Sequence, residues 1–255
     1  MRATPQLLRT VGLPIATAVM LCVLWQIIVM ANGIPEYILP APSDVGRTLV
    51  ASLPNLLAHA SISGTEAVAA FLLATLLGFV AAAVLTYSPL LRDIFYPPIV
   101  GFQLIPKVAL APLFIVWLGT ESASRIAFAT FLSFFPVLIS TLTGLQNADP
   151  TAVRLCRSLT ASDWQTFVSV RIPFSLPYFF SATKVAATLA VTGIIVAEFI
   201  TANAGLGFLI LSSGPRMDTL TIFAAIFMLC IVGLSLYGTV ALLERAGRRW
   251  FTGNR

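Results

Sequence analysis

The sequence predicts an all-α, polytopic membrane protein with six transmembrane helices. Its 255 residues are 58% hydrophobic and 10% charged, and the mean hydropathy is +0.94. A soluble domain carries about 25% charged residues, so this chain has too few charges to cover a soluble surface. Its apolar residues gather in runs of about 20 or more, the length that crosses a bilayer core as a helix. We expect one membrane domain over residues 1–255.

Six continuous apolar runs are the expected spans. Continuous hydrophobicity favours helices, whereas barrel strands would alternate. The runs are Val11–Met30, Gly64–Tyr87, Ile94–Leu118, Ser124–Leu145, Tyr178–Thr201 and Asp218–Leu242. The first run exceeds the apolar region of a signal peptide, which is about 7–15 residues, so we expect it to be a retained span.

The arginines predict the orientation of the chain. If the N-terminus lies in the cytoplasm, six spans place ten of the thirteen arginines inside and leave Arg47, Arg125 and Arg216 outside. This bias follows the positive-inside rule, so both termini are expected in the cytoplasm. The same rule accounts for the net charge of +5, and we expect contact with membrane lipid but not with nucleic acid.

The long outer loop, residues 31–63, is expected to contain a short helix on the membrane surface. Ser43 and Asp44 are good N-cap residues after a proline-marked turn. Val45, Leu49 and Leu53 then recur at helical spacing, which predicts an apolar face toward the membrane.

The third run is interrupted by four prolines, at positions 97, 98, 106 and 112. Proline in a spanning helix frees backbone groups that neighbouring helices or water must satisfy. Two interpretations stay open: simple kinks that serve packing, or a helix that bends and lines a path across the membrane.

A polar stretch separates the fourth and fifth runs on the cytoplasmic side. It contains "VRLCRSLTASDWQTFVSVRIPFSLP", residues Val153–Pro177. Asp149 is the expected N-cap of a first helix, Ser162 caps a second with Asp163 in its first turn, and Pro173 is expected to end it. The pattern predicts a helix–turn–helix parallel to the membrane and suited to docking another protein. An amphipathic helix that only lies at the interface is the alternative.

This stretch resembles the cytoplasmic loop of permeases of ATP-binding-cassette (ABC) importers, whose pattern is E-A-A-x3-G-x9-I-x-L-P. Laid on this chain, the pattern falls on Arg154, Leu155, Cys156, Thr160, Val170, Ile172 and Pro173. The tail "VRIP" fits the pattern. Arg154 stands where glutamate is usual. Thr160 stands where glycine is usual, and threonine resists the positive φ that glycine permits.

Most of the remaining chain is similar to the nitrate/sulfonate/taurine branch of these permeases. The resemblance rests on "IPEYILPAPSDVGRTL", "LLRDIFYPPIVGFQLIPKVALAPLFIVWLG", "FFPVLISTLTGLQNADP", "WQTFVSVRIPFSLPYFFSATKVA" and "VAEFITANAGLGFLIL". The variant "QLIPKVALAPL" resembles members that import pyrimidine thiamine precursors or similar ring compounds.

The resemblance implies the type I ABC-importer permease (MetI-like) fold in a bacterial inner membrane. It implies a homodimer of permeases, two cytoplasmic ATPase subunits and an extracytoplasmic binding protein that delivers a sulfonate, taurine, nitrate or pyrimidine-like solute. No G-x-x-x-x-G-K-[ST] phosphate loop occurs in the sequence. We therefore expect no cofactor in this chain and expect ATP on the partner subunits.

Residues 149–173, the docking element, would couple the permease to the ATPases. The residues expected at the ATPase contact are Arg157, Ser158, Leu159, Thr160, Ala161, Ser162 and Asp163. ATP-driven closure of the ATPases would then move this element and rock the spans between two access states.

Ionisable residues inside the spans mark a candidate translocation path, because charge at membrane depth usually faces a cavity or a partner. Lys107 lies near the middle of the third run and Glu198 near the outer end of the fifth. Their opposite charges predict a pair, across the path or across a subunit interface, that either acts as a gate or fixes packing. Gln103 and Thr192 are neutral candidates for lining the path.

Three further polar features have simpler interpretations. Glu66 and Lys184, near the ends of their spans, are expected to extend toward the interface. The outer segment "TANAGLGFLILSSGPRMD" either touches the binding protein, forms an outer gate or is a connector.

Two rival functions were weighed. A stand-alone secondary transporter or channel often has two matched broken helices, but the prolines here concentrate in one run. A membrane enzyme needs clustered catalytic groups or metal ligands. The single histidine, His59, and three scattered cysteines give no such cluster, so we expect no metal site and no enzyme.

Overall fold

The structure is a computed structural model that describes residues 12–201 and 203–252, with side chains as far as residue 247. Within this part every regular element is a helix. The elements are α2 (Leu13–Ala31), α3 (Pro42–Ala51), α4 (Leu53–Tyr87), α5 (Pro89–Phe102), η2 (Lys107–Leu110), α6 (Ala111–Leu118), α7 (Ser122–Gln146), α8 (Pro150–Ser158), α9 (Asp163–Thr166), η3 (Phe167–Arg171), α10 (Ile172–Thr201), α11 (Leu206–Ser213), η4 (Gly214–Arg216) and α12 (Thr219–Thr252).

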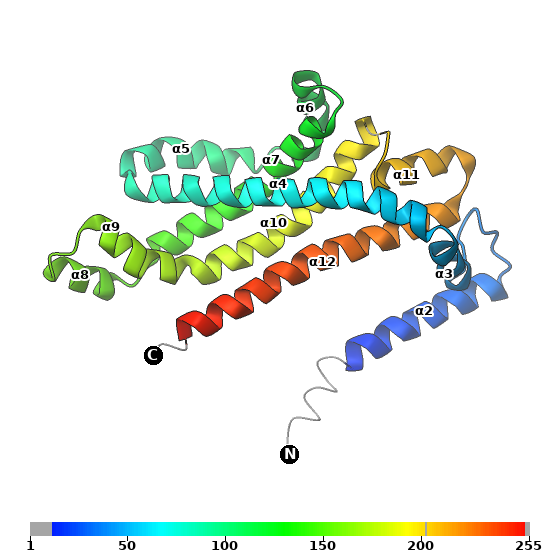
Figure 1. Cartoon of the computed structure of the whole chain (residues 1–255), viewed down its shortest axis with the longest axis horizontal. Helices are drawn as coiled ribbons and strands as arrows, with labels where there is room; N and C mark the ends of the chain where they lie inside the picture. The colour runs from blue at the N-terminus through cyan, green and yellow to red at the C-terminus, as the bar shows by residue number, and fades with distance from the viewer. Residues whose placement is uncertain (1–11, 202, 253–255) are drawn as a thin grey trace, which may run out of the picture.

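Long helices run lengthwise through the molecule, and short helices lie at its ends. Figure 1 shows α4, α7, α10 and α12 side by side, with α8 and α9 at one end and α3 and α11 at the other. Helix α2 lies at the edge, where it meets the rest through α3 and through the ring contact between Trp25 and Phe223, 5.5 Å apart. The predicted arginines Arg2, Arg9 and Arg255 lie outside the described residues.

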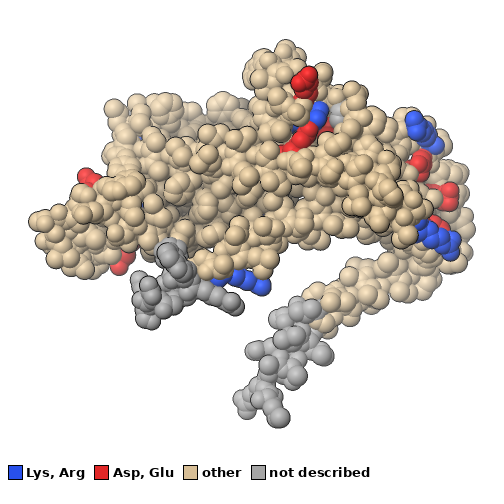
Figure 2. Space-filling model, viewed as in Figure 1, with Lys and Arg blue, Asp and Glu red and all other residues tan. Residues whose placement is uncertain are grey.

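The length and composition of the helices agree with a multi-pass membrane protein. Five helical stretches are long and apolar enough to cross a bilayer, at 13–31, 53–87, 122–146, 163–201 and 219–247. The pair α5 and η2–α6 makes a sixth crossing if this bent pair is one span. Figure 2 shows few charged side chains over the middle of the visible face and more toward its ends.

Small residues let the central helices approach closely. Helix α7 packs most extensively against α10 and α4. A Cβ at Gly193 of α10 would lie 2.7 Å from the backbone of Ala129, and one at Gly78 of α4 would lie 2.8 Å from Val137. Membrane helices associate through such close packing because lipid tails are as apolar as the helix surfaces, so the hydrophobic effect does not drive helices together.

The short helix predicted within residues 31–63 exists, but its predicted boundaries are wrong. Helix α3 begins at Pro42 with Ala41 as N-cap, since proline pre-sets the first helical turn. The Ser43 amide instead donates to the side chain of Gln26, at 3.0 Å. Leu53 already belongs to α4, so residues 53–63 extend the second span and are not loop.

Candidate functional site

The docking element consists of two capped helices and a tight turn. The carboxylate of Asp149 accepts a hydrogen bond from the Thr151 amide at 2.8 Å, as expected for the N-cap of α8. Ser162 caps α9: its hydroxyl accepts from the Gln165 amide, and the Gln165 side chain accepts from the Ser162 amide. This reciprocal capping box fixes the start of the second helix.

Thr160 closes α8 in a left-handed conformation, with φ of +57°. The Ala161 amide donates to the Cys156 carbonyl at 3.0 Å, and the Thr160 amide donates to the Arg157 carbonyl at 3.1 Å. This is the Schellman arrangement, which usually has glycine at the left-handed position. Threonine therefore keeps the turn that the glycine of the importer pattern would form, at a strain of about 1–2 kcal/mol.

The second helix of the element continues without a break into the fifth span. The prediction that Pro173 ends it is wrong, because residues Asp163–Thr201 form one continuous helical stretch of 39 residues. A π-helical turn, η3, separates α9 from α10 and shifts the hydrogen-bond register, with the Ile172 amide donating to the Phe167 carbonyl. Pro173 follows directly after this register shift, where the i→i−4 hydrogen-bond ladder is already interrupted and a residue without an amide can be accommodated.

The inner side of the docking element is fastened to the bundle. Phe167 is buried and its ring lies 4.8 Å from that of Tyr87, at the end of α4. The guanidinium of Arg171 donates to the Leu145 carbonyl of α7 at 3.0 Å. The element therefore sits on the ends of α4 and α7 as well as on α10.

The outer side of the docking element exposes large apolar side chains. Leu159 is 70% exposed, Trp164 64% and Leu155 59%. This stretch consists of α8, α9 and the turn between them, which lie at one end of the bundle in Figure 1 and not along the length of the spans. Large apolar side chains on an exposed polar segment are typical of a surface that contacts a protein or a membrane.

The third apolar segment is broken. Helices α5 and η2–α6 meet at an angle of 95° across residues 103–106, and none of the α5 residues is buried. Gln103 is exposed at the break, and Leu104 is 87% exposed. A bend of this size is far larger than a kink that serves packing requires. It therefore favours the second interpretation, a segment that bends and lines a path.

Lys107 lies just after the break against a row of aromatic rings. Its ammonium nitrogen is 5.1 Å from the centre of the Phe135 ring, a cation–π distance. The Phe135 ring is 5.2 Å from that of Phe131, which is 5.5 Å from that of Phe114. The rings join the broken segment to α7.

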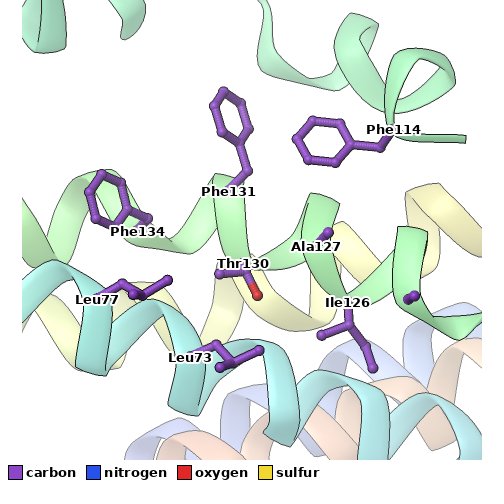
Figure 3. Close-up of a pocket in the computed structure, with 9 residues that line it drawn as sticks. Leu73, Leu77, Phe114, Ile126, Ala127, Thr130, Phe131 and Phe134 are labelled. Carbon is purple, nitrogen blue, oxygen red and sulfur yellow. The ribbon is translucent and has the colours of Figure 1, made fainter. Parts of the chain in front are cut away.

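An apolar groove of about 430 Å³ lies beside these rings, between α4, α6 and α7. Figure 3 shows Phe114 of α6 facing Phe131 of α7, with Leu73 and Leu77 of α4 on the other side. Among the residues labelled in Figure 3, only Thr130 has a polar side chain. Its hydroxyl donates a hydrogen bond to the Ala70 carbonyl at 3.4 Å. The groove offers contact surface but little hydrogen bonding.

Glu198 is buried at the opposite end of α10 from the docking element. Its carboxylate accepts hydrogen bonds from the Ser63 hydroxyl and the Gly207 amide, each at 2.6 Å. Lys107 contacts Phe135 instead, so the ion pair predicted between Lys107 and Glu198 is not formed within one chain. A backbone amide from α11, which the charges in the sequence cannot reveal, occupies the carboxylate instead. Pairing across a subunit interface stays a prediction.

Two other predicted positions are also corrected. Glu66 does not extend to the interface: it is buried and paired with Arg125 of α7, with Nε–Oε2 at 2.8 Å. Lys184 forms an ion pair with Glu244 of α12. Burial of charge beside a bundle favours such pairing over extension to water.

Within the described residues, no group of three or more His, Cys, Asp or Glu could hold a metal ion.

Comparison with known proteins decides the identity of the family. The family model described as "Binding-protein-dependent transport system inner membrane component" matches residues 74–249. The chain belongs to this family. It is a multi-pass permease component of ABC importers, with the predicted MetI-like fold, and the family consists of transport proteins and not enzymes.

Similar permeases cover nearly the full chain. The riboflavin transport system permease protein RibX of Chloroflexus aurantiacus is 34% identical over 94% of this chain and 90% of its own. The formylaminopyrimidine transport permease protein ThiX of Halalkalibacterium halodurans is 31% identical over 91% and 92%. The taurine transport system permease protein TauC of Escherichia coli is 28% identical over 95% and 90%.

The permease brings the predicted docking residues together but separates the predicted path residues. Arg157, Ser158, Leu159, Thr160, Ala161, Ser162 and Asp163 form one continuous turn, exposed except for the half-buried Ala161. Gln103 and Lys107 flank the break, whereas Thr192 lines a groove of about 490 Å³ between α10 and α12. Sequence reasoning missed Leu155 and Trp164, although large apolar residues in a polar loop are a signal that could have found them.

Proposed function

We propose that two copies of this permease form the translocation path and that one ATPase subunit binds the docking element of each copy. The observation that carries the proposal is the exposed turn of residues 157–163 with Leu155, Leu159 and Trp164 beside it. Exposed apolar groups around a rigid capped turn offer an ATPase a defined contact. The fastening of Phe167 and Arg171 to the bundle would pass force from that contact to the spans.

The broken third segment supports the homodimer and the path. Non-helical backbone at membrane depth is tolerated only when protein buries it or when it lines a water-filled cavity. Residues 103–106 are exposed in the single chain, beside the charge of Lys107. A second copy facing this side would enclose the break, so Gln103 and Lys107 are assigned to the path. Glu198 and Thr192 are not part of this surface.

The orientation follows from the same proposal. The ATPases bind ATP and lie in the cytoplasm with the docking element and both termini. The opposite end, with α3, α11 and η4, then faces the extracytoplasmic binding protein. Arg47 and Arg216 lie at that end, which agrees with the orientation drawn from the arginines.

The proposed solute is a small organic compound or anion, with a ring compound favoured over a sulfonate, taurine or nitrate. The relatives named for riboflavin and formylaminopyrimidine match at 34% and 31%, and the taurine relative matches at 28%. The row of rings from Phe114 to Phe135 beside Lys107 supports the same choice, because aromatic faces stack on planar rings.

Co-purification tests the proposed function. The tagged permease is isolated in mild detergent from its own organism, alongside the variants Thr160→Arg and Thr120→Arg, and each preparation is assayed for ATPase. We expect the ATPase to accompany the wild type and Thr120→Arg, whose substitution lies at the other end, and to be lost with Thr160→Arg. Folded wild-type permease without any ATPase would contradict the proposal and favour a stand-alone carrier.

A further inference from the structure

The buried carboxylate of Glu198 joins three helices at the outer end of the molecule. Glu198 belongs to α10, its partner Ser63 to α4, and its partner Gly207 to α11. The Ser63 hydroxyl also accepts from the Leu206 amide at 2.8 Å. His59 of α4 accepts from the Gly205 amide at 3.0 Å. Three successive amides at the start of α11 are thus held by side chains of α4 and α10.

The fit at this junction depends on glycine. Gly205 has φ of +111°, and a Cβ there would overlap the Glu198 carboxylate. A Cβ at Gly207 would lie 2.8 Å from the Glu198 side chain. The chain therefore brings the backbone of α11 as close to this carboxylate as backbone geometry allows.

Among the described residues, no lysine or arginine forms an ion pair with the carboxylate of Glu198. Arg125 is engaged by Glu66 through its Nε and Nη2 atoms. Glu198 is 1% exposed, so the hydrogen-bond donors of Ser63 and Gly207 must satisfy it. Movement of α11 away from α10 would remove the Gly207 amide and leave this buried carboxylate with Ser63 as its donor, which favours movement of the two helices together.

Glu198 lies on the same continuous helix as the docking element. The stretch of 39 residues from Asp163 to Thr201 is about 58 Å long at 1.5 Å per residue. One end begins at the proposed ATPase contact, and Glu198 lies in the last turn at the other end. We propose that Glu198 is a positioning residue that locks α11 to this helix, so that displacement of the docking element is carried to the outer surface.

The inference rests on the proposed function, and its test separates the two. In a background with Cys22, Cys156 and Cys230 replaced by serine, single cysteines are placed at Leu211 of α11 and, separately, at Ile200 of α10, both about half exposed. The co-purified permease–ATPase complex is treated with a membrane-impermeant maleimide, without nucleotide or trapped with ATP and vanadate. We expect trapping to change both labelling rates at least threefold.

The variants decide the role of the carboxylate. In Glu198→Ala, the Ile200 position should still respond to trapping and the Leu211 position should not. Glu198→Gln keeps one acceptor oxygen and should restore part of the response, which a merely structural role would not predict. Glu66→Gln is the matched control, since it alters a buried carboxylate at the same end that does not touch α11. There both responses should remain.

Several results would overturn the inference. An unchanged Leu211 response in Glu198→Ala would show that α11 does not depend on this contact. A wild-type complex in which neither position responds would show that the helix does not carry the displacement. If Glu198→Ala fails to form the complex, Ser63→Ala and Glu198→Gln take its place, and a full Leu211 response in both would reject the lock. Absence of any ATPase would instead reject the proposed function itself.

Discussion

The third apolar segment and the helical stretch Asp163–Thr201 both contain prolines, but only the third segment is broken. The third segment carries Pro106 at its break and turns through 95° there. The stretch Asp163–Thr201 carries Pro173 and Pro177 ahead of the fifth apolar run, and its 39 residues continue as one helix. The difference shows that the number of prolines does not decide whether a membrane segment breaks.

Packing and hydrogen-bond register decide it. Helix α10 buries a stripe of small residues against α7, including Ala186, Ala190 and Gly193. The π turn at 167–171 also resets the register just before Pro173. Helix α5, in contrast, has no buried residue, so it is held less firmly on the bundle than α10 is. A firmly packed helix can transmit displacement, and an exposed broken segment can line a path.

The largest loss of stability is expected when the buried ion pair between α4 and α7 is broken, because both helices pack against α10. Glu66→Ala leaves Arg125 buried without its partner between α4 and α7. Loss of one member of a buried ion pair costs about 3 kcal/mol or more, so the free energy of unfolding should fall by that amount. Unfolding in mild detergent measures it. Glu36→Ala, in the segment between α2 and α3, is the control, and an equal loss in both variants would contradict the pairing.

The second-largest loss of stability is expected from overpacking of α10, the helix that stays straight. Gly193→Val places a side chain against the Ala129 backbone, and overpacking of this kind costs about 1–3 kcal/mol. The thermal unfolding midpoint should drop clearly. Gly233→Val of α12, where a Cβ would meet no atom within 4 Å, should leave it nearly unchanged. If the two variants unfold alike, close packing does not hold α10 in place.

Replacement of Lys107 tests whether the broken segment faces lipid or a water-filled path. A lysine facing lipid costs about 2.5–3.5 kcal/mol, so its replacement would stabilise the protein by that amount. If Lys107 lines a wet path, Lys107→Met loses only its contact with Phe135 and should lower the free energy of unfolding by about 1 kcal/mol or less. Unfolding of the reconstituted permease distinguishes these values. A stabilisation near 3 kcal/mol would place the lysine against lipid.

The smallest effect is expected at the turn of the docking element. Thr160→Gly relieves the left-handed strain but adds flexibility to the unfolded chain, so the net gain should stay below about 1 kcal/mol. Hydrogen exchange of the Ala161 amide, which is bonded to Cys156, should slow by no more than about fivefold. Thr160→Val keeps the strain and should show no slowing. Faster exchange in the glycine variant would contradict the strain.

Local features were predictable from the sequence, and distant pairings were not. The caps at Asp149 and Ser162 depend on neighbours within three residues, so the starts of α8 and α9 could be predicted correctly. Glu66 and Arg125 are 59 residues apart, and only the packing of α4 on α7 brings them together. The partners of Glu198 include a backbone amide, which leaves no trace in a pattern of charged residues. The prediction that Pro173 ends the second helix failed because the π turn before it cannot be recognised from residue types.

The central claim is that the docking element controls access to the broken segment, and one cysteine tests it most directly. Gln103→Cys is placed in the cysteine-free background, and its reaction with a membrane-impermeant maleimide is measured in the permease–ATPase complex. We predict that trapping with ATP and vanadate changes the rate at least tenfold and that Thr160→Arg abolishes the change. A cysteine that stays unreactive, or reacts at the same rate in every state, would contradict the account.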